Sequence, residues 1–250
     1  MKQITIRVYG PLNDFLPPVE RQLWRSYAFE GRASVKDLIE RFGVPHPEID
    51  LILVNGNSVP FGYPVQDADR VSVFPRFHAL DIDGVTQVRP PPLGTAHFIL
   101  DGHLGKLARH LRLLGLDTAY VADARDEELA DVAAREGRIL LTRDLALLKR
   151  RVVAHGYFVR ETVPRRQLSE VLRRFWPVPV APLSRCLRCN AELRAVPKSV
   201  VEARLPLRTR RYYDEFRACP GCDRVYWKGS HWSRLTRVAD AVLNEMDAWD

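Results

Sequence analysis

The sequence has little lysine, little cysteine and no long apolar run. Only six of its 38 basic residues are lysine, so arginine carries the basic character of the chain. No stretch approaches the roughly 18 consecutive apolar residues of a membrane-spanning helix. The opening residues, MKQITIRVYGPLNDF, lack the apolar core and small-residue cleavage site of a signal peptide. We therefore expect a cytoplasmic protein that does not associate with a membrane.

The composition is that of a folded protein with a basic excess in its later part. Hydrophobic residues make up 46% and charged residues 28% of the 250 positions, which excludes a wholly disordered chain. The net charge is +7, and the pI of about 9.4 admits a polyanionic partner. Residues 1–80 carry no net charge, whereas 97–176 and 177–250 each carry +4. A polyanion would therefore bind the second two-thirds.

Two proline clusters divide the chain. They are RPPPLG at 89–94 and WPVPVAPLS at 176–184, and X-Pro steps favour extended backbone and end helices. We expect four segments: a domain over 1–80, a proline-rich linker over 81–96, a domain over 97–178, and a last domain over 179–250.

The first segment has the pattern of a small α+β module. Alternating residues over 3–9 predict a strand, and a second strand is expected near 22–29. Ser34 is a candidate N-cap for a helix that ends before Gly43. Residues 51–54 and 71–74 predict two further strands. This order resembles the ubiquitin-like β-grasp fold, and the VNGNSV turn resembles that of small sulfur-carrier proteins. The carriers act through a free C-terminal Gly-Gly that this module lacks, so a docking or packing role, with a possible protein partner, is expected.

The middle segment alternates strands and helices, which predicts a parallel sheet flanked by helices. Asp101 and Asp144 each follow a predicted strand, and Asp126 precedes the helix after another. Sites in such sheets form beyond the carboxyl ends of the strands. Three carboxylates there would repel one another unless a cation such as Mg²⁺ or Mn²⁺ lay between them.

That arrangement is typical of metal-dependent phosphodiester cleavage. Three cations on the helix after Asp101 share a broad face and could hold phosphates: Lys106, Arg109 and Arg112. Each aspartate also has a purely structural interpretation, because Asp101, Asp126 and Asp144 all stand where an N-cap would stand.

Longer motifs in this segment favour the catalytic interpretation of the aspartates over the structural one. The run DGHLGKLARHLRLLG at 101–115, the acidic cluster DEEL at 126–129 and GRILLTRD at 137–144 resemble the Mut-seven C-terminal RNase family, a PIN-like group. The resemblance covers about 97–235 and extends to YWKGSH near the C-terminus. It implies a PIN-type fold and metal-dependent RNA cleavage at an aspartate-rich site.

By position, Asp101, Asp126 and Asp144 match the acidic motif residues of the family. PIN sites usually contain a fourth acid, for which Asp123, Glu127 and Glu128 compete with Asp126. Arg143 either contacts phosphate as part of the catalytic site or pairs with a neighbouring carboxylate.

The only cysteines form two C-x₂-C pairs. Cys186 and Cys189 are separated from Cys219 and Cys222 by 29 residues, and each pair has the spacing of a zinc knuckle. Four thiolates leave no open position on Zn²⁺, so one structural zinc is expected in a ribbon. A redox or iron–sulfur role is the alternative. Arg185, Arg188 and Arg217 lie beside the cysteines and could offset their negative charge.

Arginines alternate with aromatics between the two pairs. Arg208, Arg210 and Arg211 precede two tyrosines, a combination that can bind phosphates and stack unpaired bases. The alternative is a solvated loop whose aromatics pack on the ribbon. Residues 235–249 predict an amphipathic C-terminal helix.

Together these features predict an α+β multidomain protein: a β-grasp module, a PIN-like α/β domain with a parallel sheet, and a four-cysteine zinc ribbon. The expected activity is hydrolysis of RNA phosphodiesters with Mg²⁺ or Mn²⁺. Two alternatives stay open, a zinc-ribbon RNA-binding protein without catalysis and an adaptor whose β-grasp module is the functional part.

Overall fold

A computed structural model describes the chain except for residues 78–79, 230–235, 238–239, 242–243 and 245–250. The helix expected over 235–249 lies mostly outside these described residues. Within them, no helix is long and apolar enough to cross a membrane.

Internal contacts divide the chain into two units, which are described separately. The first contains Met1–Pro92 and Asp144–Phe158, and the second contains Leu93–Arg143 and Val159–Asp250. The expected boundary at residue 178 has no counterpart in this division, and a segment from the middle of the chain belongs to the first unit.

The first unit is built on a five-stranded sheet with the order β2-β1-β5-β3-β4. Strands β1 and β5 are parallel, whereas the β1–β2, β3–β5 and β3–β4 pairs are antiparallel. Its elements are β1 (Lys2–Val8), β2 (Arg25–Phe29), α1 (Val35–Arg41), β3 (Ile49–Val54), β4 (Asn57–Ser58), β5 (Arg70–Pro75), α4 (Leu145–Leu148) and β9 (Gly156–Phe158). The β-grasp prediction is confirmed.

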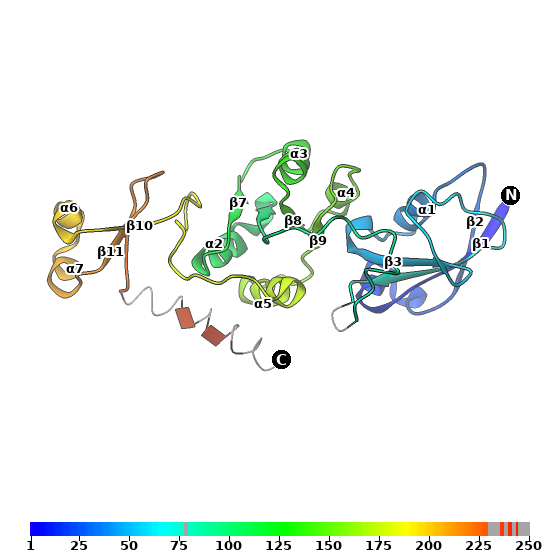
Figure 1. Cartoon of the computed structure of the whole chain (residues 1–250), viewed down its shortest axis with the longest axis horizontal. Helices are drawn as coiled ribbons and strands as arrows, with labels where there is room; N and C mark the ends of the chain where they lie inside the picture. Colours follow the sequence, from blue (N-terminus) through cyan, green and yellow to red (C-terminus); the bar gives the residue numbers. More distant parts are fainter. Residues whose placement is uncertain (78–79, 230–235, 238–239, 242–243, 245–250) are drawn as a thin grey trace. The chain divides into compact units, whose positions relative to one another are not determined.

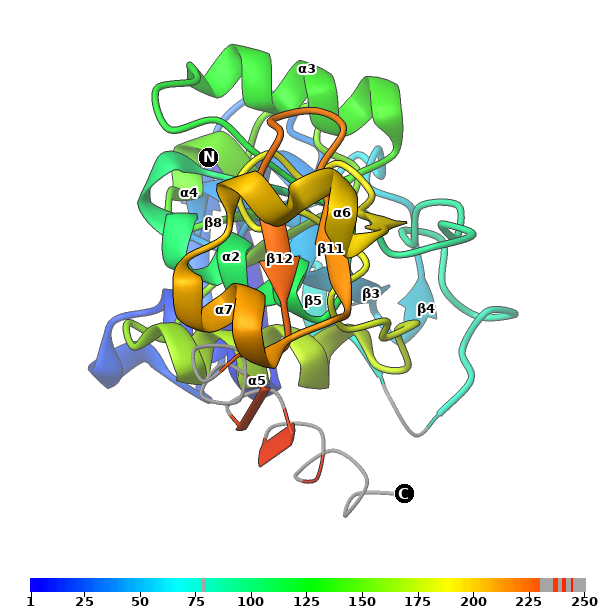
Figure 2. The same cartoon turned by 90° about the vertical axis from the view of Figure 1, so that its left-hand side faces the viewer.

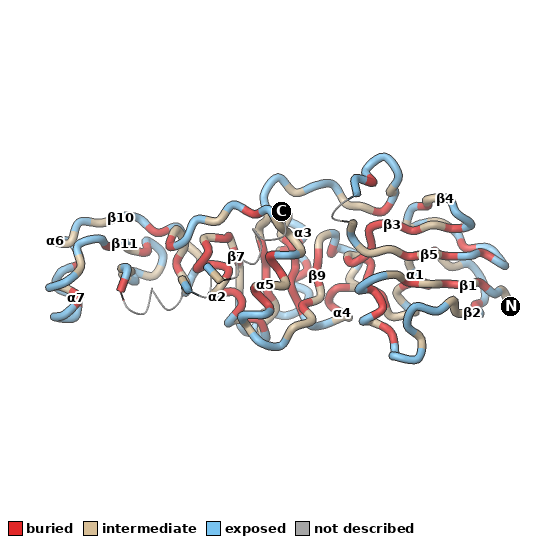
Figure 3. Tube along the Cα trace, turned by 90° about the horizontal axis from the view of Figure 1, so that it is seen from below, coloured by how far each residue is buried: buried red, intermediate tan, exposed pale blue. Residues whose placement is uncertain are grey.

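Local signals in the sequence explain this module. Ser34 caps α1 by accepting from the Asp37 N–H at 3.1 Å, and Asp37 in turn accepts from the Ser34 N–H. Alternate residues of β1, among them Ile4 and Ile6, face the core. Buried residues accordingly follow β1, β3 and β5 (Figure 3).

The second unit contains three parallel strands in the order β7-β6-β8. Helix α3 packs against β6 and β8, and α2 packs against β7 and α5, so α3 and α5 lie on opposite sides of the strands (Figures 1 and 2). The elements of this part are β6 (Phe98–Leu100), α2 (Gly105–Leu113), β7 (Thr118–Tyr120), α3 (Asp126–Glu136), β8 (Ile139–Thr142) and α5 (Pro164–Phe175). The predicted parallel sheet is confirmed.

The rest of the second unit is a small antiparallel sheet beside the four cysteines. Its order is β10-β11-β12, and two short helices connect the first two strands. The elements are β10 (Arg194–Val196), α6 (Lys198–Val201), α7 (Leu207–Tyr212), β11 (Phe216–Ala218) and β12 (Val225–Trp227). The cysteine cluster is consistent with a zinc ribbon.

Candidate functional site

Asp101 directly follows the central strand β6. Its N–H donates to the Leu141 carbonyl at 3.1 Å, and its Oδ2 accepts from the Thr142 hydroxyl at 2.8 Å. Gly102 packs so tightly against the end of β7 that an added Cβ would lie 2.4 Å from the Ala122 carbonyl oxygen. Asp101 is therefore held at the carboxyl end of two neighbouring strands, as the sequence predicts.

The acidic cluster around Asp126 is arranged differently from the expectation. Asp126 is the first residue of α3, and the N-cap position is occupied by Arg125. The Arg125 guanidinium binds Glu128 at 2.9 and 3.0 Å, and these hydrogen bonds lower the pKa of Glu128. Glu128 thus binds the N-cap residue Arg125. Asp123 and Asp126 are exposed.

Asp144 is the N-cap of α4. Its Oδ1 accepts from the Ala146 N–H at 2.6 Å and from the Leu147 N–H at 3.2 Å. The capping interpretation is correct for this residue, and capping through one oxygen leaves it exposed. Asp144 belongs to the first unit, and Asp101 and Asp126 belong to the second.

Arg143 binds backbone carbonyls and forms no ion pair with a carboxylate within the described residues. Its Nη1 donates to the carbonyls of Val159, Arg160 and Glu161, each at 2.8 Å. The side chain therefore ties the end of β8 to the backbone that precedes α5.

The three cations expected on α2 separate into two groups. Lys106 and Arg109 are exposed, but Arg112 is only 3% exposed. Its guanidinium donates to the carbonyls of Thr118, Leu187 and Arg188 at 2.9, 3.3 and 2.8 Å. Burial lowers the pKa of Arg112, and the nearby Cys186 and Cys189 oppose this shift. Assigning Arg112 to phosphate binding was wrong, because it is buried as a bridge to the first cysteine loop.

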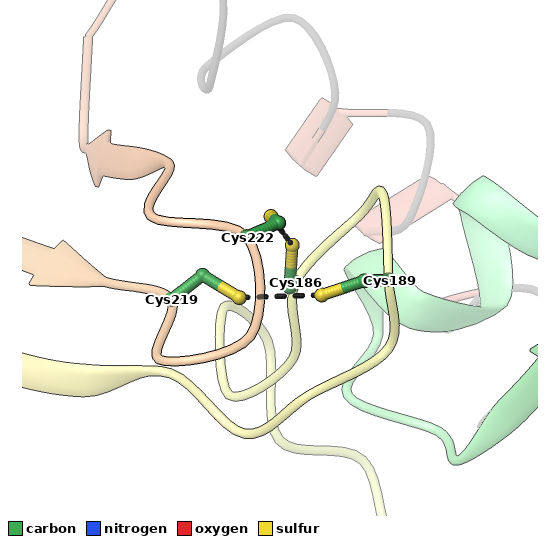
Figure 4. Close-up of side chains that lie close together, drawn as sticks. All are labelled: Cys186, Cys189, Cys219 and Cys222. Carbon is green, nitrogen blue, oxygen red and sulfur yellow. Dashed lines mark hydrogen bonds between the residues drawn. The ribbon is translucent and has the colours of Figure 1, made fainter.

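The four cysteines come together from two loops whose side chains point toward one another (Figure 4). All four sulfurs lie within 4.8 Å, the only such group of potential metal ligands found within the described part of the chain. Sulfur separations of 3.5 Å for Cys186–Cys222 and 3.3 Å for Cys189–Cys219 far exceed the roughly 2.05 Å of a disulfide. A tetrahedral ion with bonds of about 2.3 Å spaces its thiolates at about 3.8 Å, so the cluster fits zinc.

The two loops repeat one backbone design. In each, the residue after the second cysteine has a positive φ, 69° at Asn190 and 58° at Asp223. Its N–H donates to the carbonyl of the first cysteine, at 3.0 and 2.9 Å. This geometry directs both sulfurs of each pair to one side, as a metal knuckle requires.

The cysteine thiols differ in pKa because their surroundings differ. Burial raises the pKa of the Cys186 thiol, but hydrogen bonds from Tyr226 and from the N–H groups of Cys189 and Arg188 outweigh it and lower the pKa to about 6. Burial and the hydrogen bond with Cys189 raise the pKa of Cys219 to about 12. Tyr226 lies 3.1 Å from the Cys186 sulfur and orients it, as groups behind metal ligands commonly do.

The arginine-rich segment between the cysteine pairs forms α7 and its flanks. Arg208 and Arg211 are exposed, and the Arg211 guanidinium lies 5.6 Å from the Tyr212 ring centre. Arg210 donates to the Glu202 carbonyl at 2.8 Å. Tyr213 packs on a cluster that contains Phe216, so the packing interpretation is correct for Tyr213, whereas Tyr212 stays exposed.

Sequence reasoning missed two contributors. The first is Asp117, which binds Arg138, Arg185 and Asn190 and was not among the candidate residues. Arg224 was not singled out, although it lies two residues after the last cysteine and is exposed. Its position beside a knuckle is the one signal that the sequence offers.

Comparisons with known proteins agree with this arrangement. The Mut7-C RNAse domain matches residues 96–239, and the Mut7-C ubiquitin domain matches residues 1–81. No curated protein matches the chain. Among solved structures, it is similar to the putative molybdopterin converting factor subunit 1 of Pyrococcus furiosus, with 21% identity and a TM-score of 0.25 over 31% of this chain and all of that chain. That score is too low to bear on fold or function. The family domains span most of the sequence in the order that its motifs indicate, and the chain therefore belongs to the Mut7-C RNAse family.

Proposed function

We propose that this protein is a metal-dependent ribonuclease that hydrolyses RNA phosphodiester bonds. The single observation that carries the proposal is the match of residues 96–239 to the Mut7-C RNAse domain. Asp101 directly follows the parallel strand β6, which is consistent with a site at the carboxyl end of the sheet. The preference for RNA over DNA rests on the family alone.

Asp101 and Asp144 are the first two proposed ligands of the catalytic ion. The Thr142 hydroxyl fixes one oxygen of Asp101, and within the described residues no donor engages the other oxygen. Asp144 follows Thr142 by two residues, so the two Cα atoms are at most about 7.6 Å apart. Thr142 thus orients Asp101 through its side chain and precedes Asp144 by two residues.

A third acid would come from the start of α3. Glu128 is committed to Arg125, which leaves Asp126, with Asp123 or Glu127 as the fourth acid. Asp123 and Asp126 are exposed and have no partner within the described residues. Oxygen donors of this kind fit Mg²⁺ or Mn²⁺, which prefer carboxylate and water ligands.

The chemistry needs little else from the chain. A bound Mg²⁺ or Mn²⁺ would supply a water of lowered pKa and neutralise charge on the phosphate. Lys106 and Arg109 are exposed on the helix that starts beside Asp101 and would bind backbone phosphates. Arg208 and Arg211 would add further phosphate contacts from the ribbon. Arg143 holds the end of β8 through Nη1, and as an exposed cation it would also contact phosphate.

The test incubates the full chain with end-labelled RNA or DNA in the presence of Mn²⁺, Mg²⁺ or EDTA. Asp101→Asn and Asp144→Asn are compared with Asp131→Asn, an exposed carboxylate of α3. We expect RNA cleavage that requires the added ion, and a loss of at least about 100-fold in the first two variants only. Their zinc content and RNA affinity should be unchanged. Wild-type protein that binds RNA and never cleaves it would overturn the proposal in favour of an RNA-binding protein.

A further inference from the structure

The second unit contains a cavity of about 430 Å³ whose lining is rich in arginine. It lies between α2 and the two cysteine loops, and its lining includes Gly105, Arg109, Arg112, Tyr120, Arg188 and Arg224. The four guanidinium-bearing residues come from three separate parts of the chain. The positive charge of the cavity therefore arises from folding, and no run of basic residues in the sequence predicts it.

Three of these arginines have no counter-charge. Arg109, Arg188 and Arg224 are exposed, and none forms an ion pair with a carboxylate within the described residues. Arg112 lies behind them, with its guanidinium taken up by backbone carbonyls. Like charges held this close repel one another unless an anion lies between them. The cavity is therefore suited to an anion with several oxygens.

We propose that this cavity binds a backbone phosphate of single-stranded RNA, and that the cysteine loops build it. The proposal deepens the ribonuclease function proposed above and rests on it. Planar guanidinium groups bind phosphate oxygens in pairs, and Tyr120 offers a ring on which the adjoining base stacks.

The cavity adjoins the proposed catalytic carboxylate. The Tyr120 hydroxyl donates to the Gly102 carbonyl at 2.9 Å, and Gly102 directly follows Asp101. An added Cβ at Gly105 would lie 2.7 Å from the Tyr120 hydroxyl, so glycine there permits this close approach. A strand anchored in the cavity would have a neighbouring phosphodiester near Asp101.

The cysteine loops set the positions of two of the arginines. Arg188 lies between Cys186 and Cys189, and its carbonyl accepts from Arg112 at 2.8 Å. The Arg224 carbonyl accepts from the Cys219 N–H at 2.8 Å. A metal bound by the four thiolates would constrain both backbones in addition to the hydrogen bonds of Arg112 and Asn190 at the first loop, so its loss should loosen the cavity. The four-cysteine centre thereby contributes to RNA affinity as well as to stability.

The test measures the affinity of the full chain for a fluorescent single-stranded RNA by anisotropy, without added divalent ion so that cleavage does not interfere. The double variant Arg188→Gln, Arg224→Gln is compared with Arg194→Gln, an exposed arginine of β10 outside the cavity. We expect Kd to rise at least about tenfold and the slope of log K against log salt to fall by about 1.4 for two lost phosphate contacts. The control should change Kd less than about threefold, and all proteins should retain equal zinc.

The outcomes separate this proposal from the ribonuclease proposal. If the wild type cleaves RNA and the double variant binds with an unchanged Kd and salt slope, the cavity proposal is overturned and the nuclease stands. If the double variant loses binding while the wild type never cleaves, the cavity stands and the nuclease fails. Competition by a glutamate-rich peptide that is as strong as competition by RNA would identify an acidic protein ligand and would also overturn the proposal.

A second observation independently concerns the β-grasp module, which packs against residues 144–158 of its own chain. His46 Nε2 lies 2.9 Å from the Val153 carbonyl, and Lys149 Nζ donates to the Glu40 carbonyl at 2.7 Å. Glu48 accepts from the Phe158 N–H at 2.6 Å, although the segment is about 110 residues away in sequence.

These contacts are buried. His46 is 7% and Glu48 is 4% exposed, and a carboxylate removed from water is costly unless it is hydrogen-bonded. The Phe158 N–H supplies such a bond. Residues 144–158 therefore supply hydrogen-bond partners to buried polar groups of the module.

We infer that the module is a positioning device for Asp144, the first residue of this segment. The inference rests on the proposed role of Asp144. By fixing both α4 and the strand after it, the module holds the start of α4, where the Asp144 carboxylate projects. The ubiquitin-like fold would thus serve the reaction from within the same chain.

The test replaces His46 with Phe, which keeps a ring against Phe61 and removes both hydrogen bonds of the imidazole. Asn55→Gly is the matched control. It also removes two hydrogen bonds inside the module, and neither bond involves residues 144–158. Glycine readily adopts the φ of 51° found at this position. We expect His46→Phe to lower kcat and raise the Mn²⁺ concentration for half-maximal activity about tenfold, with KM for RNA unchanged and faster amide exchange over 144–158. The inference would be overturned if His46→Phe kept the kinetic constants of the wild type. It would also be overturned if Asn55→Gly lost as much activity as His46→Phe.

Discussion

The carboxamide of Asn190 donates to Asp117 Oδ1 at 2.8 Å and thereby fastens the first cysteine loop to the edge strand β7. The same side chain accepts from the Thr118 N–H at 3.0 Å. Asp117 also binds Arg138 at 2.7 Å and Arg185 at 3.3 Å. Burial raises the pKa of Asp117, but the bonds from Arg138 and Asn190 outweigh it, so the pKa is lowered and the carboxylate is charged. Asn190 thus provides the positive φ of the first cysteine loop and joins that loop to the sheet.

Replacing Asn190 with Gly should destabilise the second unit by about 2–3 kcal/mol. Glycine accepts the positive φ, so the loss reflects two hydrogen bonds of about 1 kcal/mol each and the extra chain entropy of glycine. Asp223→Gly is the matched control, because it occupies the same place in the other knuckle and its side chain is exposed. Urea unfolding should separate the two variants, and equal destabilisation would contradict the role given to Asn190.

Removing the bound metal should disorder the ribbon and leave the β-grasp module folded. The four sulfurs lie within 4.8 Å of one another, and the free energy of binding a structural zinc contributes directly to folding. Amide exchange after chelation should rise over 183–193 and 216–227, whereas β1, β3 and β5 should stay protected. Elemental analysis should find about one zinc per chain beforehand. Retained protection around the cysteines after complete metal loss would exclude a structural site.

Replacing Thr142 with Val should weaken the response to Mn²⁺ about tenfold with little change in RNA affinity. The hydroxyl that orients Asp101 is lost from a fully buried position, while the volume of the side chain is nearly kept. Thr118→Val is the control, because Thr118 is equally buried and its hydroxyl donates to the Leu116 carbonyl at 3.0 Å. The dependence of cleavage on Mn²⁺ concentration checks this, and an identical effect of both substitutions would refute it.

The free energy of unfolding should decrease as the pH falls below about 6.5. Burial lowers the pKa of His110 from its ordinary value of 6.5, with a contribution from Arg109, while the Pro164 carbonyl opposes the shift. The unfolded chain then takes up the proton first, so acid favours unfolding, and one such group contributes at most about 1.4 kcal/mol per pH unit. Burial and Arg76 lower the pKa of His155 in the same direction.

Urea midpoints between pH 7.5 and 5.5 measure this dependence. His110→Phe should flatten the slope, because it removes one titrating group and a buried Nδ1 that has no hydrogen-bond partner within the described residues. His103→Gln, at an exposed position, should leave the slope as it is. A slope that is unchanged in His110→Phe would rule out this histidine as the source.

Much of the fold could be predicted because local chemistry determines it. Ser34 and Asp37 specify the start of α1, Gly115 with its φ of 84° ends α2, and the pair of C-x₂-C motifs specifies the knuckles. Alternation over β1 and the strand–helix order of the middle segment gave the two sheets. Each of these signals lies within a few residues of the structure it produces.

The remainder depended on contacts between distant residues. The cation spacing on α2 suggested one phosphate-binding face, but Arg112 turns inward because the carbonyls of Leu187 and Arg188 lie there, 75 and 76 residues away in sequence. Arg143 finds three carbonyls beyond β9 that no spacing rule indicates. Neither the partner of His46 nor the grouping of Arg109 with Arg224 could be read from sequence, because both follow from tertiary packing.

Residues 144–158 fall inside the stretch matched by the RNAse domain, yet they pack with the ubiquitin-like module. Cutting the chain at the sequence boundary between the two family domains would leave the buried His46 and Glu48 without their hydrogen-bond partners at Val153 and Phe158. We therefore expect that exchanging either domain for an unrelated one requires redesign of the residues that make these contacts.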